Sequence, residues 1–249
     1  MTKRETERKR PGPADARPII ITGAARSGLS VVAGVLHCCG AWGGKIYPKT
    51  GRYTFDNPQL HGLLVRPFLH GLRVDPRCQE SLPKIQQVFE IAPKIAPEWR
   101  RRALDVLRKQ HCPFRGPWMY KSSVAAAVWP LWALAFPEAA WVIVRRNRAA
   151  VINACIKTGY MDGRTTVESW GDWYDAFEAR ISEIDERAGL VEPGNKLTVY
   201  NLWPARILRG DTKDARSVVE SLNLSWNQQA VADFLAPARW ESGIFGARD

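Results

Sequence analysis

Apolar residues along the chain fall into short β-prone runs that alternate with longer helical patterns. A β-branched run at 18–22 precedes an apolar segment at 30–39 that is dense enough for a buried helix. The same order returns with a short aromatic run at 117–121 and a second apolar helix at 124–136. Residues 141–144, Trp-Val-Ile-Val, form a continuous apolar run that is typical of a central parallel strand covered on both faces.

Further periodic segments extend this alternation of strands and helices. They predict helices at 84–91, 97–110, 148–157, 166–189, 215–222 and 228–235, and a strand at 196–200. The alternation implies an α/β fold with three α/β/α layers and a mostly parallel central sheet. We expect a single domain at 18–249, preceded by a disordered basic arm at 1–17.

Two side-chain stripes on the predicted helices have an ordinary structural interpretation. Aromatic residues recur at helical spacing in 166–189 and should face the core rather than a ligand: Trp170, Trp173, Tyr174 and Phe177. Basic residues in 97–110 should form a solvated face, with an anion-binding surface as the alternative: Arg100, Arg101, Arg102, Arg108 and Lys109.

The composition adds a large positive charge to this picture. The 249 residues include 36 Lys and Arg against 25 Asp and Glu, which gives a formal net charge of +11. Such a charge implies an acidic partner. A phosphorylated small molecule, a nucleic acid and an anionic surface all fit, and nucleic acid is not the favoured one.

The cysteines and the apolar runs indicate a cytoplasmic protein without a membrane span. Five cysteines without CxxC spacing fit reduced thiols. The longest apolar run, 124–136, is too short to cross a bilayer and contains Pro130. The start of the chain lacks the apolar region of a secretory signal. Four histidines without an i, i+4 pair argue against a metal site.

The clearest chemical signal is the loop at 23–30, GAARSGLS, between the first strand and the first helix. Its spacing is that of the phosphate-cradling loop GxxxxGK[ST], with Leu29 in place of the lysine. Backbone N–H groups and the positive end of the following helix still favour an anion, and Arg26 is the cation inside the loop. A turn that only packs is the alternative. The predicted anion-binding residues are Gly23, Ala24, Ala25, Arg26, Ser27, Gly28, Leu29 and Ser30.

Cations also follow the next two predicted strands. Lys121 ends the strand at 117–121, and Arg145 and Arg146 follow the strand at 141–144. Ligands of open α/β sheets bind at the carboxyl ends of the strands, so we expect these cations near the loop. Solvated charges at a strand exit are the alternative.

A long segment at 40–58, rich in Gly and Pro, has the composition of a surface loop, and loops of this length are often functional. Asp56 and His61 lie where it returns to a helical pattern. Asp56 is either the N-cap of a helix that starts near Pro58 or a catalytic base, with His61 as the second candidate for the base.

The order and spacing of these segments resemble those of sulfotransferases over most of 18–240. The segment ITGAARSGLS resembles the family's 5′-phosphosulfate-binding loop, in which a strand leads into PRSGTT or PKSGTT. A second block, YTFDNPQLHGLLVRPFL, resembles the "fEN" segment of sulfotransferase-like proteins of bacteria and phages. A third, from PWMYKSS to WVIVRRNRAAVINA, resembles the block that ends in the family's 3′-phosphate site.

The resemblance implies a P-loop-like sulfotransferase fold and transfer of a sulfuryl group from 3′-phosphoadenosine 5′-phosphosulfate (PAPS). The acceptor would be a hydroxyl or amine of a small-molecule or carbohydrate-like compound, and no metal would be required. Arg26, the loop amides and Ser30 would bind the 5′-phosphosulfate. Lys121 would lie near the leaving group, and Arg146, with Arg145, would bind the 3′-phosphate.

The sequence departs from the family's pattern in three places, one of which is Asn147-Arg148, where the family has Asp-Pro. Leu29 stands where the family has Thr, and Ala154 stands where its 3′-phosphate serine falls. Two other functions therefore compete with sulfuryl transfer. A P-loop kinase or nucleotide hydrolase would need the loop lysine that is absent here. A non-catalytic member of the fold, binding a nucleotide, nucleic acid or protein, fits the missing hydroxyls and the net charge.

Overall fold

Four parallel strands form the central sheet of the computed structural model, which describes residues 17–44, 48–49, 52–53, 55–160, 163–187 and 197–236. In sheet order the strands are β4 (Trp118–Lys121), β1 (Pro18–Thr22), β5 (Ala140–Val144) and β6 (Thr198–Leu202). All residues of β4, β1 and β5 are buried, as their apolar runs predict. A separate antiparallel pair is formed by β2 (Pro48–Lys49) and β3 (Arg52–Tyr53).

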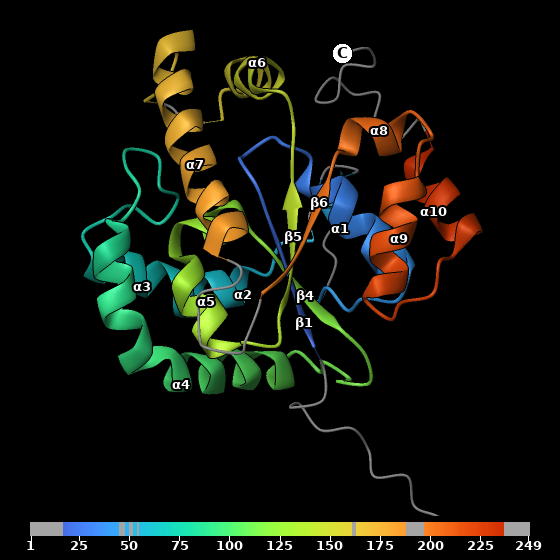
Figure 1. Ribbon diagram of the computed structural model, residues 1–249, viewed down its shortest axis with the longest axis horizontal. Coiled ribbons are helices and arrows are strands. Elements are labelled where there is room, and N and C mark those ends of the chain that lie inside the picture. The colour runs from blue at the N-terminus through green and yellow to red at the C-terminus, as the bar shows by residue number, and fades with distance from the viewer. Residues whose placement is uncertain are drawn as a thin grey trace, which may run out of the picture.

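One face of the sheet is covered by the first helix and the three last ones (Figure 1). These are α1 (Leu29–Cys38), α8 (Pro204–Leu208), α9 (Lys213–Ser221) and α10 (Gln228–Leu235). They pack on side chains such as Ile19, Ile21 and Val142. Gly34 of α1 leaves the space that the Phe234 ring of α10 occupies, because a Cβ there would lie 1.9 Å from that ring.

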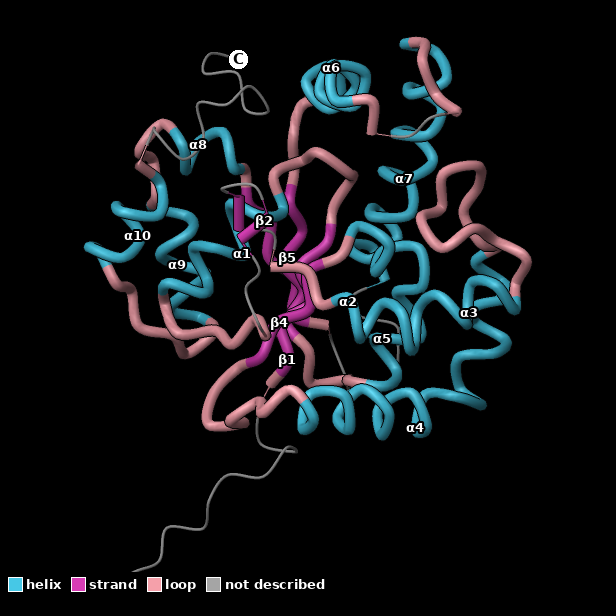
Figure 2. Tube along the Cα trace, turned by 180° about the vertical axis from the view of Figure 1, so that it is seen from behind, coloured by secondary structure: helices cyan, strands magenta, loops and turns pink. Residues whose placement is uncertain are grey.

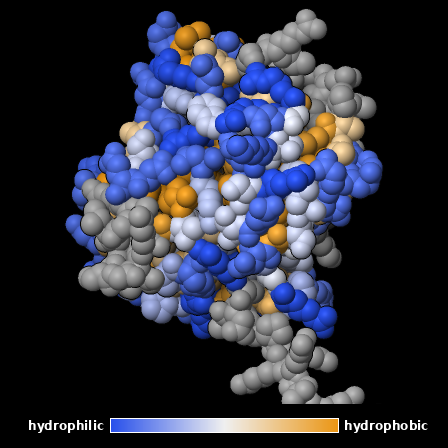
Figure 3. Space-filling view, turned by 45° about the vertical axis from the view of Figure 1, so that its right-hand side comes forward, coloured by the Kyte–Doolittle hydropathy of each residue, from blue (hydrophilic) through white to orange (hydrophobic). Residues whose placement is uncertain are grey.

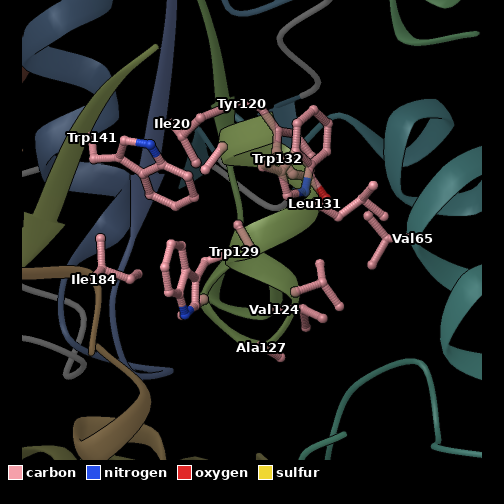
Figure 4. Packing of buried hydrophobic residues seen from close by; sticks show 14 of the residues in the cluster. Ile20, Val65, Tyr120, Val124, Ala127, Trp129, Leu131, Trp132, Trp141 and Ile184 are labelled. Atoms are coloured by element: carbon pink, nitrogen blue, oxygen red, sulfur yellow. The ribbon is translucent and has the colours of Figure 1, made fainter. Parts of the chain in front are cut away.

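The opposite face is covered by a layer rich in tryptophan. It contains the 3-10 helix η2 (Ser123–Val128), α5 (Trp129–Ala135), α7 (Val167–Arg187) and α4 (Ile85–Lys109). Figure 4 shows Trp129 and Trp132 of α5 with Ile20 and Trp141 of the sheet, all in one hydrophobic cluster. The three-layer α/β/α fold with a parallel sheet is therefore confirmed.

The aromatic stripe of α7 faces this core, as predicted. Trp170 and Phe177 are fully buried, and Trp173 and Tyr174 are nearly so. The basic face predicted at 97–110 is also confirmed as a solvated one. Its exposed arginines pair with Glu98 and Asp105 on the same helix, and Arg100 pairs with Glu138.

Short elements complete the chain. The helical turn α2 (Pro58–Leu60), the π-helix η1 (His61–Val65) and α3 (Arg66–Gly71) follow one another directly. The helix α6 (Arg148–Thr158) lies beyond the carboxyl end of β5 and packs against α7 (Figures 1 and 2). The sequence pattern did not predict α3, α8 or the π-helical turn.

The two helices predicted at 84–91 and 97–110 are one helix, α4, with Pro93 and Pro97 inside it. Figures 1 and 2 both show this helix bent. Bending accommodates the prolines, which lack an N–H and clash with the preceding turn. Residues on both sides of the bend, Val88 and Ala103 among them, are fully buried in the same core. Packing in the core therefore keeps the chain helical through two prolines that locally predict the end of a helix.

The helix predicted at 124–136 is divided into η2 and α5. The Thr22 hydroxyl, at the end of β1, accepts a hydrogen bond from the Ala126 N–H at 3.2 Å. It also lies 3.3 Å from the Ser123 carbonyl oxygen, to which it donates. These bonds tie the segment to the sheet in the tighter 3-10 geometry, and Pro130 starts the α-helix after it.

The remaining predictions concern the ends of segments and the surface. Residues 1–16 of the predicted arm and residue 196 of the predicted strand lie outside the described residues, whereas Arg17 donates to the Glu138 carbonyl oxygen at 2.7 Å. No helix in the described ranges is long and apolar enough to cross a membrane. The face shown in Figure 3 is mainly hydrophilic, with hydrophobic residues in separate small patches.

Candidate functional site

The loops that follow β1 and β5 meet at the carboxyl edge of the sheet. The chain leaves β1 through α1 on one face, and leaves β5 through α6 and α7 on the other, which makes the gap between the two strands a topological switch point. Gly23 lies against β5 there, because a Cβ on this residue would be 2.4 Å from the Val144 carbonyl oxygen. Glycine therefore allows the two loops to approach.

The loop at 23–30 has the geometry of an anion cradle. Arg26 and Gly28 have positive φ angles of 62° and 103°, and the Ser27 N–H donates to the Ala24 carbonyl oxygen at 3.1 Å. This turn leads into the N-terminus of α1, where the first N–H groups have no partner within the helix. The Ser27 Oγ and the Arg26 Nε are buried without a hydrogen-bond partner among the described residues. Such atoms are costly to bury unless a ligand supplies the missing hydrogen bonds.

Two side chains from outside the loop contact Arg26. The Arg26 guanidinium carbon lies 4.8 Å from the centre of the Tyr160 ring. The Arg146 Nη1 donates to the Arg26 carbonyl oxygen at 2.9 Å, and the Arg146 carbonyl oxygen in turn accepts from the Tyr174 hydroxyl at 3.1 Å. The loop after β5 thus fixes the middle of the loop after β1.

Lys121, at the end of β4, is nearly buried and brings two further predicted residues together. Its Nζ lies 2.6 Å from the Asp56 Oδ1 and 3.4 Å from the Ser30 Oγ. The backbone of Asp56 forms a parallel β-bridge with Lys121, which fixes the pair. Asp56 is not the N-cap: the Asn57 Oδ1 accepts from the Leu60 N–H at 3.0 Å. Asp56 is therefore available to Lys121.

His61, the first residue of the π-helix, is half-buried beside this pair. Burial lowers its pKa below the ordinary value of 6.5. The charge of Asp56 raises that pKa, and the charges of Arg66 and Arg77 lower it further. The net lowering favours a neutral imidazole, which can accept a proton.

Arg145 and Ala154 offer less to a ligand than the sequence implied. The Arg145 guanidinium pairs with Glu178 and Asp185 of α7, and its Nε donates to the Asn201 Oδ1 at 2.9 Å. These contacts bind β5 to α7 and β6. Ala154 is buried in α6 and brings no polar side-chain atom.

The described residues contain neither a cluster of metal ligands nor a disulfide. No group of three or more His, Cys, Asp or Glu side chains gathers within the described ranges. All five cysteines are described, and no two of them form a disulfide. Burial raises the pKa of the Cys155 thiol, which faces the charges of Arg26 and Arg146, to about 11.

Comparison with known proteins identifies the fold. No protein-family model matches the chain, and no curated protein matches its sequence. Among solved structures, the sulfotransferase domain of an olefin synthase from Synechococcus PCC 7002 is similar, with a TM-score of 0.50 and 13% identity over 90% of this chain and 78% of that chain. A sulfotransferase from Mycobacterium tuberculosis H37Rv matches with a TM-score of 0.40 and 12% identity, over 89% of this chain and 76% of that chain. The protein has a sulfotransferase-like fold.

Sequence reasoning missed two residues of this site. Tyr160 follows α6, where one aromatic residue after a glycine gives no periodic or motif signal. Arg77 lies in the segment between α3 and α4, and its charge reaches both His61 and Tyr160. Only the packing of distant segments brings Tyr160 to the loop and the charge of Arg77 within reach of His61.

Proposed function

We propose that this protein is a sulfotransferase that transfers a sulfuryl group from PAPS to a hydroxyl or amine of a small-molecule acceptor. The observation that carries the proposal is the cradle at the switch point. There the buried Arg26 Nε and Ser27 Oγ have no hydrogen-bond partner in the part of the chain that the structure describes, and they lie at the N-terminus of α1. An anionic group of the donor would accept hydrogen bonds from both atoms, so the residues present fit a 5′-phosphosulfate.

The roles of the cradle residues follow from their positions. The loop amides, Arg26 and Ser27 would hold the 5′-phosphosulfate, with Ser30 beside them. When bound, PAPS supplies the sulfuryl group and departs as 3′,5′-adenosine bisphosphate. The Lys121 ammonium group would stabilise negative charge that develops at the leaving group, since it lies beside Ser30 in a nearly buried position.

The 3′-phosphate is assigned to Arg146. It lies on the β5 side of the loop and is joined to it through the Arg26 carbonyl oxygen. Arg145 is assigned a structural role, because two carboxylates of α7 already bind its guanidinium. Because Ala154 stands where the family has a serine, this subsite has no hydroxyl at that position and would bind the 3′-phosphate mainly through Arg146.

We assign His61 as the base that takes the proton from the acceptor's hydroxyl or amine. Asp56 already shares its carboxylate with Lys121 at 2.6 Å, whereas burial keeps His61 neutral and able to accept a proton. Asp56 is then the group that orients Lys121 and stabilises His61 once it is charged. Arg66 and Arg77 add positive charge on this side, so a polar acceptor with an anionic or carbohydrate-like group fits best.

A cytoplasmic location is part of the same proposal. Five cysteines without a disulfide support a reducing compartment.

Calorimetric titration with 3′,5′-adenosine bisphosphate tests the donor site without knowledge of the acceptor. We expect micromolar binding without a divalent metal, weakened at least about tenfold by Arg146→Ala or Arg26→Ala. Arg148→Ala is the matched control, because this neighbouring arginine is half-exposed and pairs with Asp175. No binding by the wild type, or a clear preference for magnesium ATP, would reject the sulfotransferase proposal in favour of another ligand for the same fold.

A further inference from the structure

The cations at the carboxyl edge of the sheet differ in the groups that neutralise their charge. Arg145 is paired with two carboxylates, and Lys121 is paired with Asp56. Arg26 forms no ion pair with a carboxylate of the described residues. Its guanidinium instead lies over the ring of Tyr160, with 4.8 Å between the guanidinium carbon and the ring centre.

The position of the Tyr160 ring is set by two helices. Gly159 ends α6 in the left-handed conformation, with φ of 52°. The Tyr160 N–H then donates to the Cys155 carbonyl oxygen at 3.2 Å, which closes the end of the helix. The ring also packs against Trp170 of α7, with 6.3 Å between ring centres, and Trp170 is fully buried. Tyr160 is thus held independently of the loop that carries Arg26.

An aromatic ring holds a cation in a way that a carboxylate cannot. The ring's negative face attracts the guanidinium without neutralising its charge and without occupying its N–H donors. A carboxylate in the same place would occupy those donors and compete with an anionic ligand. Tyr160 stays neutral at physiological pH, because burial raises the pKa of its phenol.

The backbone of Arg26 makes such support necessary. Its φ of 62° is a left-handed conformation that is strained for a non-glycine residue. A residue in this conformation persists when its surroundings fix it. The Arg26 carbonyl oxygen is fixed by Arg146, and its side chain is fixed by the Tyr160 ring.

We infer that Tyr160 is the residue that positions Arg26 for the donor, holding the guanidinium by its ring face so that the N–H groups remain available to an anion. This inference rests on the proposed donor site. It assigns Tyr160 a positioning role through Arg26, and no direct contact with the donor.

A double-mutant cycle with 3′,5′-adenosine bisphosphate tests the inference by calorimetry. Tyr160→Leu should weaken binding about tenfold, and Tyr160→Phe, which keeps the ring, should change it less than about twofold. In the Arg26→Ala background, Tyr160→Leu should add less than about twofold, since the ring would have no guanidinium to hold. Trp226→Leu is the matched control, because Trp226 holds Arg216 at 5.2 Å in the same kind of contact, away from the loop.

A ligand-free readout separates this inference from the proposed function. The NMR signal of the Arg26 Nε–H should be shifted upfield by the ring in the wild type and in Tyr160→Phe, and should return toward the random-coil position in Tyr160→Leu. If the wild type binds inorganic pyrophosphate but not the bisphosphate, the sulfotransferase proposal fails, and the same cycle is run with pyrophosphate. The inference is overturned if the Arg26 Nε–H signal does not change in Tyr160→Leu, or if neither anion binds. It is also overturned if Tyr160→Leu weakens binding equally in the wild-type and Arg26→Ala backgrounds.

Discussion

Asp56 and Asn57 show how neighbouring side chains of similar size divide two tasks. Asn57 accepts the Leu60 N–H and exchanges hydrogen bonds with Gln110, so it starts the helix and fixes it to α4. Asp56 pairs with Lys121 instead. Capping needs only an acceptor oxygen, whereas pairing with a buried ammonium needs a negative charge. The order of the two residues therefore matters to the site.

The protonation of His61 gives a prediction at the residue scale. Because burial lowers its folded-state pKa below 6.5, the unfolded chain binds more protons as the pH falls below that value. The stability that His61 contributes is thus present at neutral pH and is lost as the pH falls through the folded-state pKa. NMR titration of His61 should give a midpoint below 6.5. In urea unfolding, His61→Gln should lose less stability than the wild type between about pH 7.5 and about pH 5.5. Equal losses would contradict the assignment.

Gly23 gives a second prediction at this scale. Gly23→Ala places a methyl group 2.4 Å from the Val144 carbonyl oxygen, so the loop must move away from β5. We expect the free energy of unfolding to fall by about 1–3 kcal/mol and bisphosphate binding to weaken. Gly116→Ala serves as the control, since nothing lies within 4 Å of its added Cβ. A Gly23→Ala protein that matches this control in urea unfolding and in binding would show that the close approach is unimportant.

At the scale of elements, one buried arginine joins three segments of the tryptophan-rich layer. Arg180 of α7 donates to the Ala127 carbonyl oxygen of η2 and to the Pro83 carbonyl oxygen before α4, each at 3.1 Å. Its Nε lies 3.3 Å from a carboxylate oxygen of Glu183. Irregular backbone at the ends of η2 and α4 is thereby satisfied in the interior.

Arg180→Met should therefore destabilise the fold strongly. The variant keeps most of the side-chain volume but leaves two buried carbonyl oxygens without their donor and Glu183 without its ion-pair partner. We expect the free energy of unfolding to fall by about 3 kcal/mol, measured by urea denaturation. Arg206→Met removes an arginine that pairs with Asp211 at the surface and should cost far less. Equal costs for the two variants would refute the role given to Arg180.

At the scale of the whole molecule, the sheet joins two hydrophobic clusters into one unit. Alternate residues of the same strand serve both, since Ile20 packs in the tryptophan-rich cluster and Ile19 and Ile21 pack in the other. If the sheet came apart on one face, the apolar residues packed on its other face would also be exposed to water. We therefore propose that the described part of the chain folds as a single domain.

Urea unfolding should accordingly show one transition. Tryptophan fluorescence reports mainly on the cluster that contains Trp129, Trp132 and Trp141, whereas amide hydrogen exchange in α9 and α10 reports on the opposite face. The midpoint by fluorescence and the loss of protection in these helices should coincide. Separate transitions would mean that α8, α9 and α10 form an independent unit.

Local patterns determined most of the elements and their order. Continuous apolar runs gave β1, β4 and β5, and the glycine-flanked loop marked the proposed anion cradle, because these features depend on neighbouring residues alone. Where propensity and packing disagreed, the sequence was a poor guide. Pro93 and Pro97 predicted a break that the core overrides within α4.

The tertiary structure alone decided how the charged side chains are used. In sequence, Arg145 and Arg146 are equivalent cations, yet α7 binds the first through Glu178 and Asp185. Tyr160 lies 134 positions after Arg26 and meets it only because α6 ends beside the loop. Charge and ring contacts act through space over a few ångströms, so no local pattern reveals them. The sequence by itself specified a sulfotransferase-like order of segments, and the folding of those segments selected the residues that face the proposed donor site.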